Sequence, residues 1–362
     1  MSFCITGVGT AVPREMIAQD DAARLALELA GASCSHGPAI QTLYRRAGVR
    51  KRHSALLTSS TNGLPAAQSF FSVAADPNDR GPSTGHRMLR YESVALELAA
   101  QAANDALRES DTCSHEISHL VTVSCTGFSA PGVDIGLMER LGLNREVSRT
   151  NVGFMGCHGA LNGLRVAASL SHSLPAGKVL LCCVELCSVH HQYSGDPQQI
   201  VANALFSDGA AAVVGTAGAT DRPWCLIDQF SCVLPETAHL MAWRIGDNGF
   251  EMRLSPQVPS AIKEMLRPWL CERLARHALD IQDVRSWAIH PGGPRILTAC
   301  ANSLGFDHGC LEPSQRVLAE YGNMSSPTVL FILEQLRAHG DCLPCVMLAF
   351  GPGLTIEAAL IV

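Results

Sequence analysis

The sequence predicts an α/β protein made of two similar halves packed together. Strand-like and helix-like segments alternate along the chain, as expected when helices cover the faces of sheets. Two motifs, Gly156-Cys157 and Gly322-Asn323, each come directly before an apolar, helix-like stretch. This internal similarity indicates a duplicated unit. Such a unit would bring the two helix N-termini face to face and set Cys157 beside Asn323.

The individual elements follow from short apolar runs and from helical spacing. We expect strands, in chain order, at residues 119–125, 178–186, 286–290 and 345–350. We expect helices at residues 91–108, 161–173, 259–279 and 327–338. Small residues and turn signals around 216–222 give the best boundary, so the two halves are taken as residues 1–220 and 221–362.

Each half also closes with a similar pattern. Phe206–Gly209 comes before the apolar run 210–214, and Phe350–Gly353 comes before the run 355–361. Both patterns predict a strand, a glycine turn and a second strand.

The composition limits the partners of the protein. Of its 362 residues, 47% are hydrophobic and only 17% are charged, against a typical charged share of about 25%. So little charge indicates a buried subunit interface, and we expect a homodimer. A net charge of −6 argues against binding to nucleic acid. No apolar run approaches the roughly 18 residues of a membrane span, and Met1–Gly7 lacks the features of a secretory signal, so we expect a cytoplasmic protein.

Cysteine is unusually frequent, with 15 copies. In a long cytoplasmic chain we expect these side chains to be reduced and packed in the core. Cys342-Leu343-Pro344-Cys345 is the one C-x-x-C motif. Because no second pair follows at zinc spacing, we expect no metal site.

Cys157 is the strongest candidate for a nucleophile. It lies among glycines where a helix is expected to begin, and free N–H groups and the helix dipole favour a thiolate there. His290 and Asn323 lie far downstream in glycine-rich segments and would supply a base and an oxyanion donor. Each residue alone fits a structural role as well; the three together favour catalysis.

With these residues, the chain resembles the type III polyketide synthases, the chalcone-synthase-like enzymes of the thiolase fold, over nearly its whole length. The matching segments are Gly156-Cys157 with its helix, Ala204–Ala211, Ile289–Gly293, Tyr321–Ser326 and Phe350–Thr355. The last segment matches the family's GFGPG loop, with Ala349 in place of the first glycine. The resemblance implies a thiolase-like α/β fold whose two halves form helix, sheet, helix, sheet and helix layers (αβαβα).

The resemblance also implies an acyltransferase that uses CoA thioesters as substrates and needs no cofactor. Cys157 would hold an acyl-CoA starter as a thioester, with His290 paired to the sulfur. Malonyl-CoA would lose CO₂, and His290 and Asn323 would stabilise the enolate that attacks this thioester. Repeated extension and cyclisation would give a pyrone, a resorcinol or a phloroglucinol.

The family pattern further implies a set of substrate-binding residues. They are Phe206, Met252, Trp243, Cys125, Cys187, His190, Ser325, Gly351, Pro352 and Gly353. Phe206 would be the gate between the CoA tunnel and the reaction cavity. Trp243 stands where relatives carry a glycine, which indicates a reshaped cavity. Met252 and the small Ala130 would suit an alkyl chain.

A basic cluster, Tyr44–His53, is the expected site for the phosphates of CoA, through Arg46, Arg50 and Arg52. Arg46 falls where family members hold a CoA-contacting lysine. The other two basic positions of that group are Ala39 and Thr42 here, so the contacts would differ. A solvated charged face is the alternative for this cluster.

Other functions stay open at this point. A β-ketoacyl synthase of fatty-acid synthesis shares the fold and the Cys-His-Asn set, but typically has an asparagine close after the histidine, where Pro291–Pro294 follow here. A non-catalytic acyl-CoA-binding homologue would normally have lost the nucleophile. A papain-like protease would have a different sequence around its cysteine. The starter, the number of extensions and the ring closure are not determined by the sequence.

Overall fold

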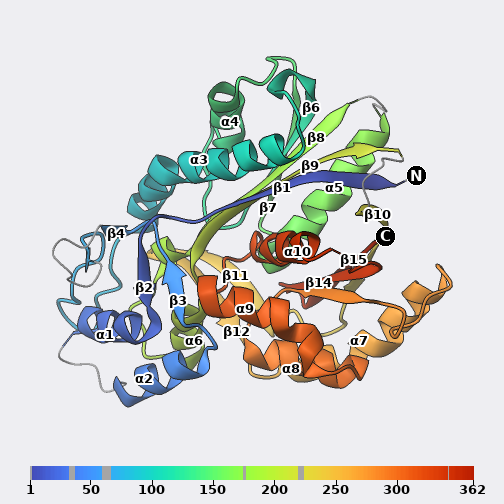
Figure 1. Cartoon of the computed structure of the whole chain (residues 1–362). Helices are drawn as coiled ribbons and strands as arrows, with labels where there is room; N and C mark the ends of the chain where they lie inside the picture. Colours follow the sequence, from blue (N-terminus) through green and yellow to red (C-terminus); the bar gives the residue numbers. More distant parts are fainter. Residues whose placement is uncertain (1, 32–36, 59–66, 174–176, 219–223, 341) are drawn as a thin grey trace.

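The computed structural model describes residues 2–31, 37–58, 67–173, 177–218, 224–340 and 342–362. The N-terminal half contributes five neighbouring strands to one large sheet (Figure 1). In spatial order they are β7 (Ser148–Gly153), β6 (Ile117–Ser124), β8 (Lys178–Leu186), β9 (Asp208–Ala217) and β1 (Phe3–Ala11). β7, β6 and β8 are parallel, whereas β9 is antiparallel to both β8 and β1.

The C-terminal half repeats this arrangement. Its strands are, in spatial order, β13 (Ser286–Ile289), β14 (Cys345–Gly351), β15 (Thr355–Ile361) and β10 (Cys225–Val233). Their pairings run parallel, antiparallel and antiparallel, as do those of β6, β8, β9 and β1. The two similar halves are therefore confirmed. Their expected boundary, between residues 220 and 221, lies outside the described residues.

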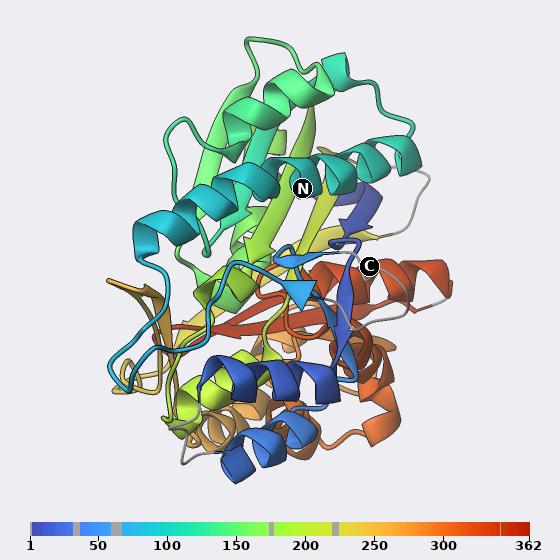
Figure 2. The same ribbon diagram turned by 90° about the vertical axis from the view of Figure 1, so that its left-hand side faces the viewer.

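Helices alternate with the N-terminal and C-terminal parts of the large sheet in five layers (Figure 2). The middle layer is formed by α5 (Gly159–Ser173) and α10 (Thr328–Ala338), whose apolar residues share one core with strands of both halves. α3 (Thr84–Glu109) and α4 (Val133–Leu141) pack on the outer face of the N-terminal strands. α7 (Val258–Ala275) and α8 (Pro294–Leu304) cover the outer face of the C-terminal strands. The thiolase-like layering implied by the resemblance is thus present.

A smaller group of elements lies beside the C-terminal half and forms its own apolar cluster. It contains β2 (Met16–Ala18), α1 (Gln19–Leu29), α2 (Gly37–Arg46), β3 (Lys51–His53) and α6 (Pro197–Leu205). The remaining elements are β4 (Leu57–Thr58), β5 (Ala67–Gln68), the hairpin β11 (Met241–Gly246) and β12 (Gly249–Leu254), α9 (Glu312–Tyr321), and 3-10 turns at Ser114–Glu116, Gly156–His158, Cys187–His190 and His308–Leu311. Within the described part, no helix is long and apolar enough to cross a membrane.

Most of the expected elements are present with shifted ends. The first long helix begins seven residues before residue 91, at Thr84, because Ser83 accepts a hydrogen bond from the His86 N–H and caps it. The expected closing pattern is correct only for the second half, where β14 and β15 follow each other. In the first half, helix α6 rather than a strand comes before Phe206.

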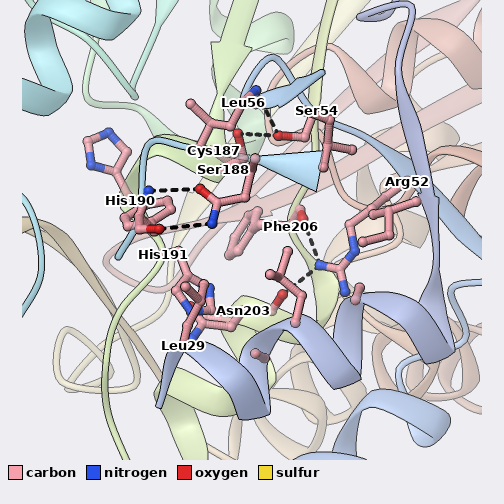
Figure 3. Close-up of a pocket in the computed structure, with 18 of the residues that line it drawn as sticks. Leu29, Arg52, Ser54, Leu56, Cys187, Ser188, His190, His191, Asn203 and Phe206 are labelled. Carbon is pink, nitrogen blue, oxygen red and sulfur yellow. Dashed lines mark hydrogen bonds between the residues drawn. The ribbon is translucent and has the colours of Figure 1, made fainter. Parts of the chain in front are cut away.

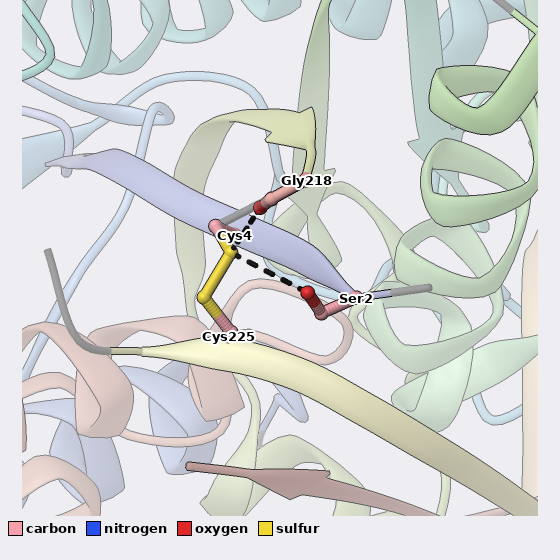
Figure 4. Close-up of a disulfide and its surroundings, with 4 residues drawn as sticks. All are labelled: Ser2, Cys4, Gly218 and Cys225. Atoms are coloured by element: carbon pink, nitrogen blue, oxygen red, sulfur yellow. Dashed lines mark hydrogen bonds between the residues drawn. A yellow bond between two sulfur atoms is a disulfide. The ribbon is translucent and has the colours of Figure 1, made fainter. Parts of the chain in front are cut away.

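One pair of cysteines differs from the expectation of reduced side chains. Cys4 on β1 and Cys225 on β10 form a disulfide (Figure 4). The two strands pair at this point, through Phe3 with Leu226 and Cys4 with Cys225. The disulfide therefore joins the two halves where their sheets meet. The other cysteines in the described residues are free.

Candidate active site

Cys157 lies just before the central helix α5, in the 3-10 turn Gly156–His158. Gly156 has a φ of +69°, and a Cβ atom there would lie 2.6 Å from Pro352 Cδ. A Cβ at Gly351 would lie 2.2 Å from His158 Cδ2. Only glycine fits at both positions, so the loop between β14 and β15 packs directly against the turn that carries Cys157.

Asn323 is adjacent to Cys157, as the internal duplication predicts. Its side-chain Oδ1 lies 4.0 Å from Cys157 Sγ and accepts the Ser325 N–H at 2.8 Å. Because Oδ1 is held in this way, the orientation of the amide is defined. Its Nδ2 group makes no hydrogen bond to the described residues and stays free to donate.

The backbone of Asn323 also holds Phe206. The Asn323 N–H donates to Leu205 O at 2.9 Å, and its carbonyl accepts the Ser207 N–H at 2.9 Å. Gly322 has a φ of +73°, and a Cβ there would lie 2.9 Å from Ser207 Oγ. The absence of a side chain at Gly322 therefore lets the segment of Asn323, the expected oxyanion donor, pack closely against the segment of Phe206, the expected gate.

His290 follows β13, and its N–H donates to Leu348 O of β14 at 2.8 Å. Its side chain is buried, and neither ring nitrogen has a hydrogen-bond partner within the described part of the chain. Burial, together with the charge of His158, lowers the pKa of His290 to about 3. The ring is therefore neutral near pH 7, with one nitrogen able to accept a proton and the other able to donate a hydrogen bond.

The thiol of Cys157 differs from the sequence-based expectation. Burial raises its pKa to about 11, and Glu185 contributes to the rise, although hydrogen bonds with Ser325 and Asn323 lower it. The expectation of a resting thiolate at a helix start is wrong, because loss of solvation outweighs the other effects. The expected hydrogen bond from His290 to the sulfur is also absent in this structure. Such bonds often form only in the substrate complex.

Glu185 on β8 is a buried acid that the sequence analysis missed. Its carboxyl group accepts from Ser326 Oγ at 2.6 Å, Thr126 Oγ at 2.7 Å and the Cys125 N–H at 2.9 Å. Burial nevertheless raises its pKa to about 7. The sequence did contain a sign of this buried acid, because Glu185 is the one glutamate inside the apolar run Lys178–Leu186. A carboxyl group buried in such a run needs hydrogen-bond partners or a proton.

Several of the expected substrate-binding residues line one pocket (Figure 3). They are Cys187, His190, Phe206, Trp243 and Met252. Trp243 Nε1 donates to Cys125 O at 2.7 Å, and the Gly156 N–H donates to Cys125 Sγ at 3.0 Å. Cys125 thus connects the wall of the pocket to the turn that carries Cys157.

Aromatic rings fill the part of this pocket next to Cys125. His190 stacks on Phe250 with a centroid distance of 4.2 Å, and Trp243 meets His190 edge-on at 5.5 Å. His190 Nδ1 accepts the Phe250 N–H at 3.0 Å, so Nε2 is the donor to Thr126 O at 2.7 Å. Burial lowers the pKa of His190 to about 3, so it is a neutral wall residue.

The three candidate CoA-binding arginines have different surroundings. Arg46 is exposed at the end of α2. Arg50 forms an ion pair with Glu320. Arg52 is buried and donates to Phe206 O at 3.0 Å, so its guanidinium holds the backbone near the gate and does not face solvent.

A second pocket extends from Arg46 to residues that neighbour Phe206 and His290. It is mainly apolar and lies between α2, α6 and α8; its wall includes Leu43, Arg46, Val201, Leu205, Leu254, Gly292, Gly293 and Arg295. Leu205 is the neighbour of Phe206, and Gly292 donates its N–H to His290 O at 3.0 Å. Arg295, exposed at the start of α8, was not among the candidates from the sequence.

Comparisons with known proteins identify the family. The model for chalcone and stilbene synthases, N-terminal domain, matches residues 2–219, and that for the C-terminal domain matches residues 226–362. The chain is 34% identical to the α-pyrone synthesis polyketide synthase-like Pks18 of Mycobacterium tuberculosis, over 98% of this chain and 90% of that protein. It is also 34% identical to 1,3,6,8-tetrahydroxynaphthalene synthase of Streptomyces peucetius subsp. caesius, over 99% and 92% of the two proteins.

Solved structures agree with this result. The structure of PKS-I from the brown alga Ectocarpus siliculosus superposes with a TM-score of 0.91 at 30% identity, covering 99% of this chain and 98% of that one. The protein is an acyltransferase of the type III polyketide synthase class. The chain belongs to the chalcone and stilbene synthase family, and the β-ketoacyl synthase alternative is set aside.

Proposed function

We propose that this chain loads an acyl group from acyl-CoA onto Cys157, extends it with malonyl-CoA, and releases it by ring closure. The proposal rests chiefly on one observation. Cys157 Sγ lies 4.0 Å from Asn323 Oδ1, while the Ser325 N–H holds that oxygen and leaves the amide nitrogen free. The proposed nucleophile thus lies next to an amide of defined orientation whose NH₂ group is available as an oxyanion donor.

In the loading step, Cys157 Sγ attacks the thioester carbonyl of the starter. The thiol proton passes to the neutral imidazole of His290, which acts as base. Asn323 Nδ2 donates to the oxygen that becomes negative in the tetrahedral intermediate. When this intermediate collapses, the carbon–sulfur bond to CoA breaks, and CoA leaves as a thiol after taking the proton from His290.

In the extension step, the carboxylate of malonyl-CoA leaves as CO₂. Its bonding electron pair forms an enolate, whose oxygen accepts hydrogen bonds from Asn323 Nδ2 and the N–H of His290. The enolate carbon attacks the acyl carbonyl on Cys157, a carbon–carbon bond forms, and the Cys157 thiolate leaves. The lengthened chain is now a CoA thioester and returns to Cys157 for the next round.

We favour a pyrone as the product. The aromatic rings of His190, Trp243 and Phe250 occupy the space beside Cys125, which leaves little room for a long polyketide to fold. After a second extension, an enol oxygen of the chain can attack its own thioester carbonyl, which closes a six-membered lactone and expels the thiol. The similarity to a relative named for α-pyrone synthesis supports this choice.

We also propose that both CoA substrates enter through the second pocket. Its apolar walls suit the pantetheine arm, and Arg46 and Arg295 suit the phosphates. The low charged share of 17% supports a homodimer, and the protein is expected to act in the cytoplasm.

Intact-protein mass spectrometry tests the proposed function. After incubation with an acyl-CoA starter, the mass should rise by one acyl group, and the Cys157→Ala protein should not change. With malonyl-CoA added, the wild-type protein should release a product whose mass corresponds to a triketide lactone. Acylation of the Cys157→Ala protein would exclude Cys157 as the acyl carrier.

A further inference from the structure

The pocket in Figure 3 continues well beyond the residues expected from the sequence. The centres of water-sized groups can occupy about 110 Å³ of it, and the wider empty space, open solvent included, is about 860 Å³. Its far walls come from helix α1, from the residues that follow β3, and from the segment between β5 and α3. The apolar residues there are Ile17, Ala22, Leu25, Ala26, Leu29, Leu56, Leu57 and Phe71.

Helix α1 presents one continuous apolar stripe to this space. Ala22, Leu25, Ala26 and Leu29 follow each other at intervals of three, one and three residues, and all four line the pocket. This spacing puts them on one face of the helix. Aliphatic side chains around empty space are matched by a ligand that is itself aliphatic.

Polar residues in the wall are largely bonded to the protein. The Asn203 amide exchanges two hydrogen bonds with the Gln192 backbone, at 3.2 and 2.9 Å. Ser188 Oγ donates to Asp208 Oδ2 at 2.6 Å. Both ring nitrogens of His190 are occupied. A ligand in this space therefore finds few free hydrogen-bonding groups, which disfavours a polar occupant.

Among the described residues of the wall, Arg52 alone has a buried side-chain nitrogen, Nε, that lacks a hydrogen-bond partner. The rest of its guanidinium donates to Asn203 O, Phe206 O and Gln19 Oε1. A ligand with a terminal carboxylate could use this single N–H. Because most of the wall is aliphatic, we expect an alkyl chain to bind better than a chain that ends in a carboxylate. The affinities of the two ligands can be compared directly.

Cys157 does not itself line this space, but residues at its near end are linked by hydrogen bonds to neighbours of Cys157. Cys187, Phe206 and Trp243 belong to its wall. The carbonyl of Phe206's neighbour Leu205 bonds to Asn323, and Trp243 bonds to Cys125. A chain attached to Cys157 that passes these residues enters the aliphatic space, which we name the α1 arm.

We infer that the α1 arm binds the unbranched alkyl tail of a fatty acyl-CoA starter, with the methyl end toward α1. This inference rests on the proposed function, because the tail is placed by its thioester at Cys157. It assigns the substrate class as medium- to long-chain acyl-CoA rather than aromatic acyl-CoA.

The direct test measures binding without turnover, in the Cys157→Ala protein. Isothermal titration with acetyl-, hexanoyl- and decanoyl-CoA should show affinity that rises with chain length, by up to about fourfold per methylene buried. Equal affinities for acetyl-CoA and decanoyl-CoA would overturn the inference. So would tighter binding of a decanoyl-length chain with a terminal carboxylate, which would assign the arm to an anionic tail at Arg52.

Two variants locate the tail, each combined with Cys157→Ala. Ala26→Phe should fill the arm and lower the affinity for decanoyl-CoA at least tenfold, while acetyl-CoA binding stays within about twofold. Leu25→Trp is a second filling variant at a half-buried position that tolerates bulk better. Ala23→Phe is the matched control, because Ala23 is buried on the same helix but does not line the pocket. Equal losses at positions 23 and 26 would overturn the inference.

Failure of the inference and failure of the proposed function give different results. Length-dependent binding that Ala26→Phe removes, without CO₂ release from malonyl-CoA by the wild-type protein, would support the arm and contradict the synthase mechanism. Normal product formation from every starter, with no effect of chain length, would support the mechanism and contradict the arm.

Discussion

Asn323 Oδ1 lies 4.0 Å from Cys157 Sγ, and the same oxygen accepts the Ser325 N–H at 2.8 Å. The second contact determines the direction of the whole amide, because an amide oxygen held by a backbone donor leaves its NH₂ group on the other side. Ser325 adopts a φ of +59°, an uncommon value for a residue with a side chain. The backbone thus takes an unfavourable conformation at the point where it orients the amide that we propose as the oxyanion donor.

Replacing Asn323 should remove that donor. We expect Asn323→Ala to lower malonyl-CoA decarboxylation at least about a hundredfold, because the enolate charge would be left unpaired in a dry cavity. Asn323→Asp keeps the shape but not the donor, and should be at least as impaired. Release of ¹⁴CO₂ from labelled malonyl-CoA measures this step alone. Rates near wild type in both variants would contradict the oxyanion role.

The reactivity of Cys157 should rise steadily with pH. Burial raises its pKa to about 11, so the thiolate fraction should grow about tenfold per pH unit between pH 7 and 9. Iodoacetamide labelling of the Cys157 peptide, followed by mass spectrometry, gives this rate. A plateau near neutral pH would instead indicate a resting thiolate paired with protonated His290, and His290→Gln should then abolish the plateau.

Stability should fall as the pH is lowered from 7 to 5. Burial lowers the pKa of His190, His191 and His290 to about 3, so below about 6.5 the unfolded chain binds protons that the folded chain does not. Glu185 acts in the opposite direction, because burial raises its pKa to about 7. For these four groups the net difference near pH 5 is about two protons, or about 3 kcal/mol per pH unit.

Urea unfolding at pH 7, 6 and 5 measures this dependence. His290→Gln should reduce the slope by about one proton, and Glu185→Gln should make it steeper by nearly one. A free energy of unfolding that stays constant between pH 7 and 5 would show that these histidines bind protons in the folded state.

Trp243→Gly should enlarge the cavity without a large loss of stability. Trp243 is half-buried and lines the pocket, so water or substrate can occupy the vacated space. We expect a longer polyketide or acceptance of a bulkier starter. Trp269 in the core beside Phe230 is the matched control, and Trp269→Ala should cost about 3–5 kcal/mol with unchanged products. The product masses and melting temperatures of both variants decide the assignment of Trp243.

Charge reversal at the second pocket should weaken CoA binding. Arg46→Glu and Arg295→Glu should raise the KM for malonyl-CoA about tenfold or more while kcat changes little, because phosphate contacts lie far from the reacting atoms. Arg50→Glu is the control, since Arg50 pairs with Glu320 and does not line the pocket. If Arg50→Glu alone raised KM, the entrance would lie on the other side of the basic cluster.

Much of the protein was determined by the sequence itself. Local spacing predicted α5 and α10 behind Gly156-Cys157 and Gly322-Asn323, and duplication predicted that Cys157 and Asn323 would meet. Such features depend on residues that are near one another in the chain or related by repetition. The sequence therefore sufficed for the fold class, for the family and for the catalytic candidates.

Other features were decided only by the tertiary structure. The raised pKa of Cys157 comes from burial by segments distant in sequence, and that burial outweighs the local effect of the turn. Arg52 was a candidate for CoA binding, but in the folded protein its guanidinium is buried against backbone carbonyl groups. Arg295 was not a candidate, yet it lines the second pocket. The disulfide from Cys4 to Cys225 and the α1 arm likewise require separate segments to pack together. Solvation and cavity shape are properties of the folded surface, and local sequence patterns do not contain them.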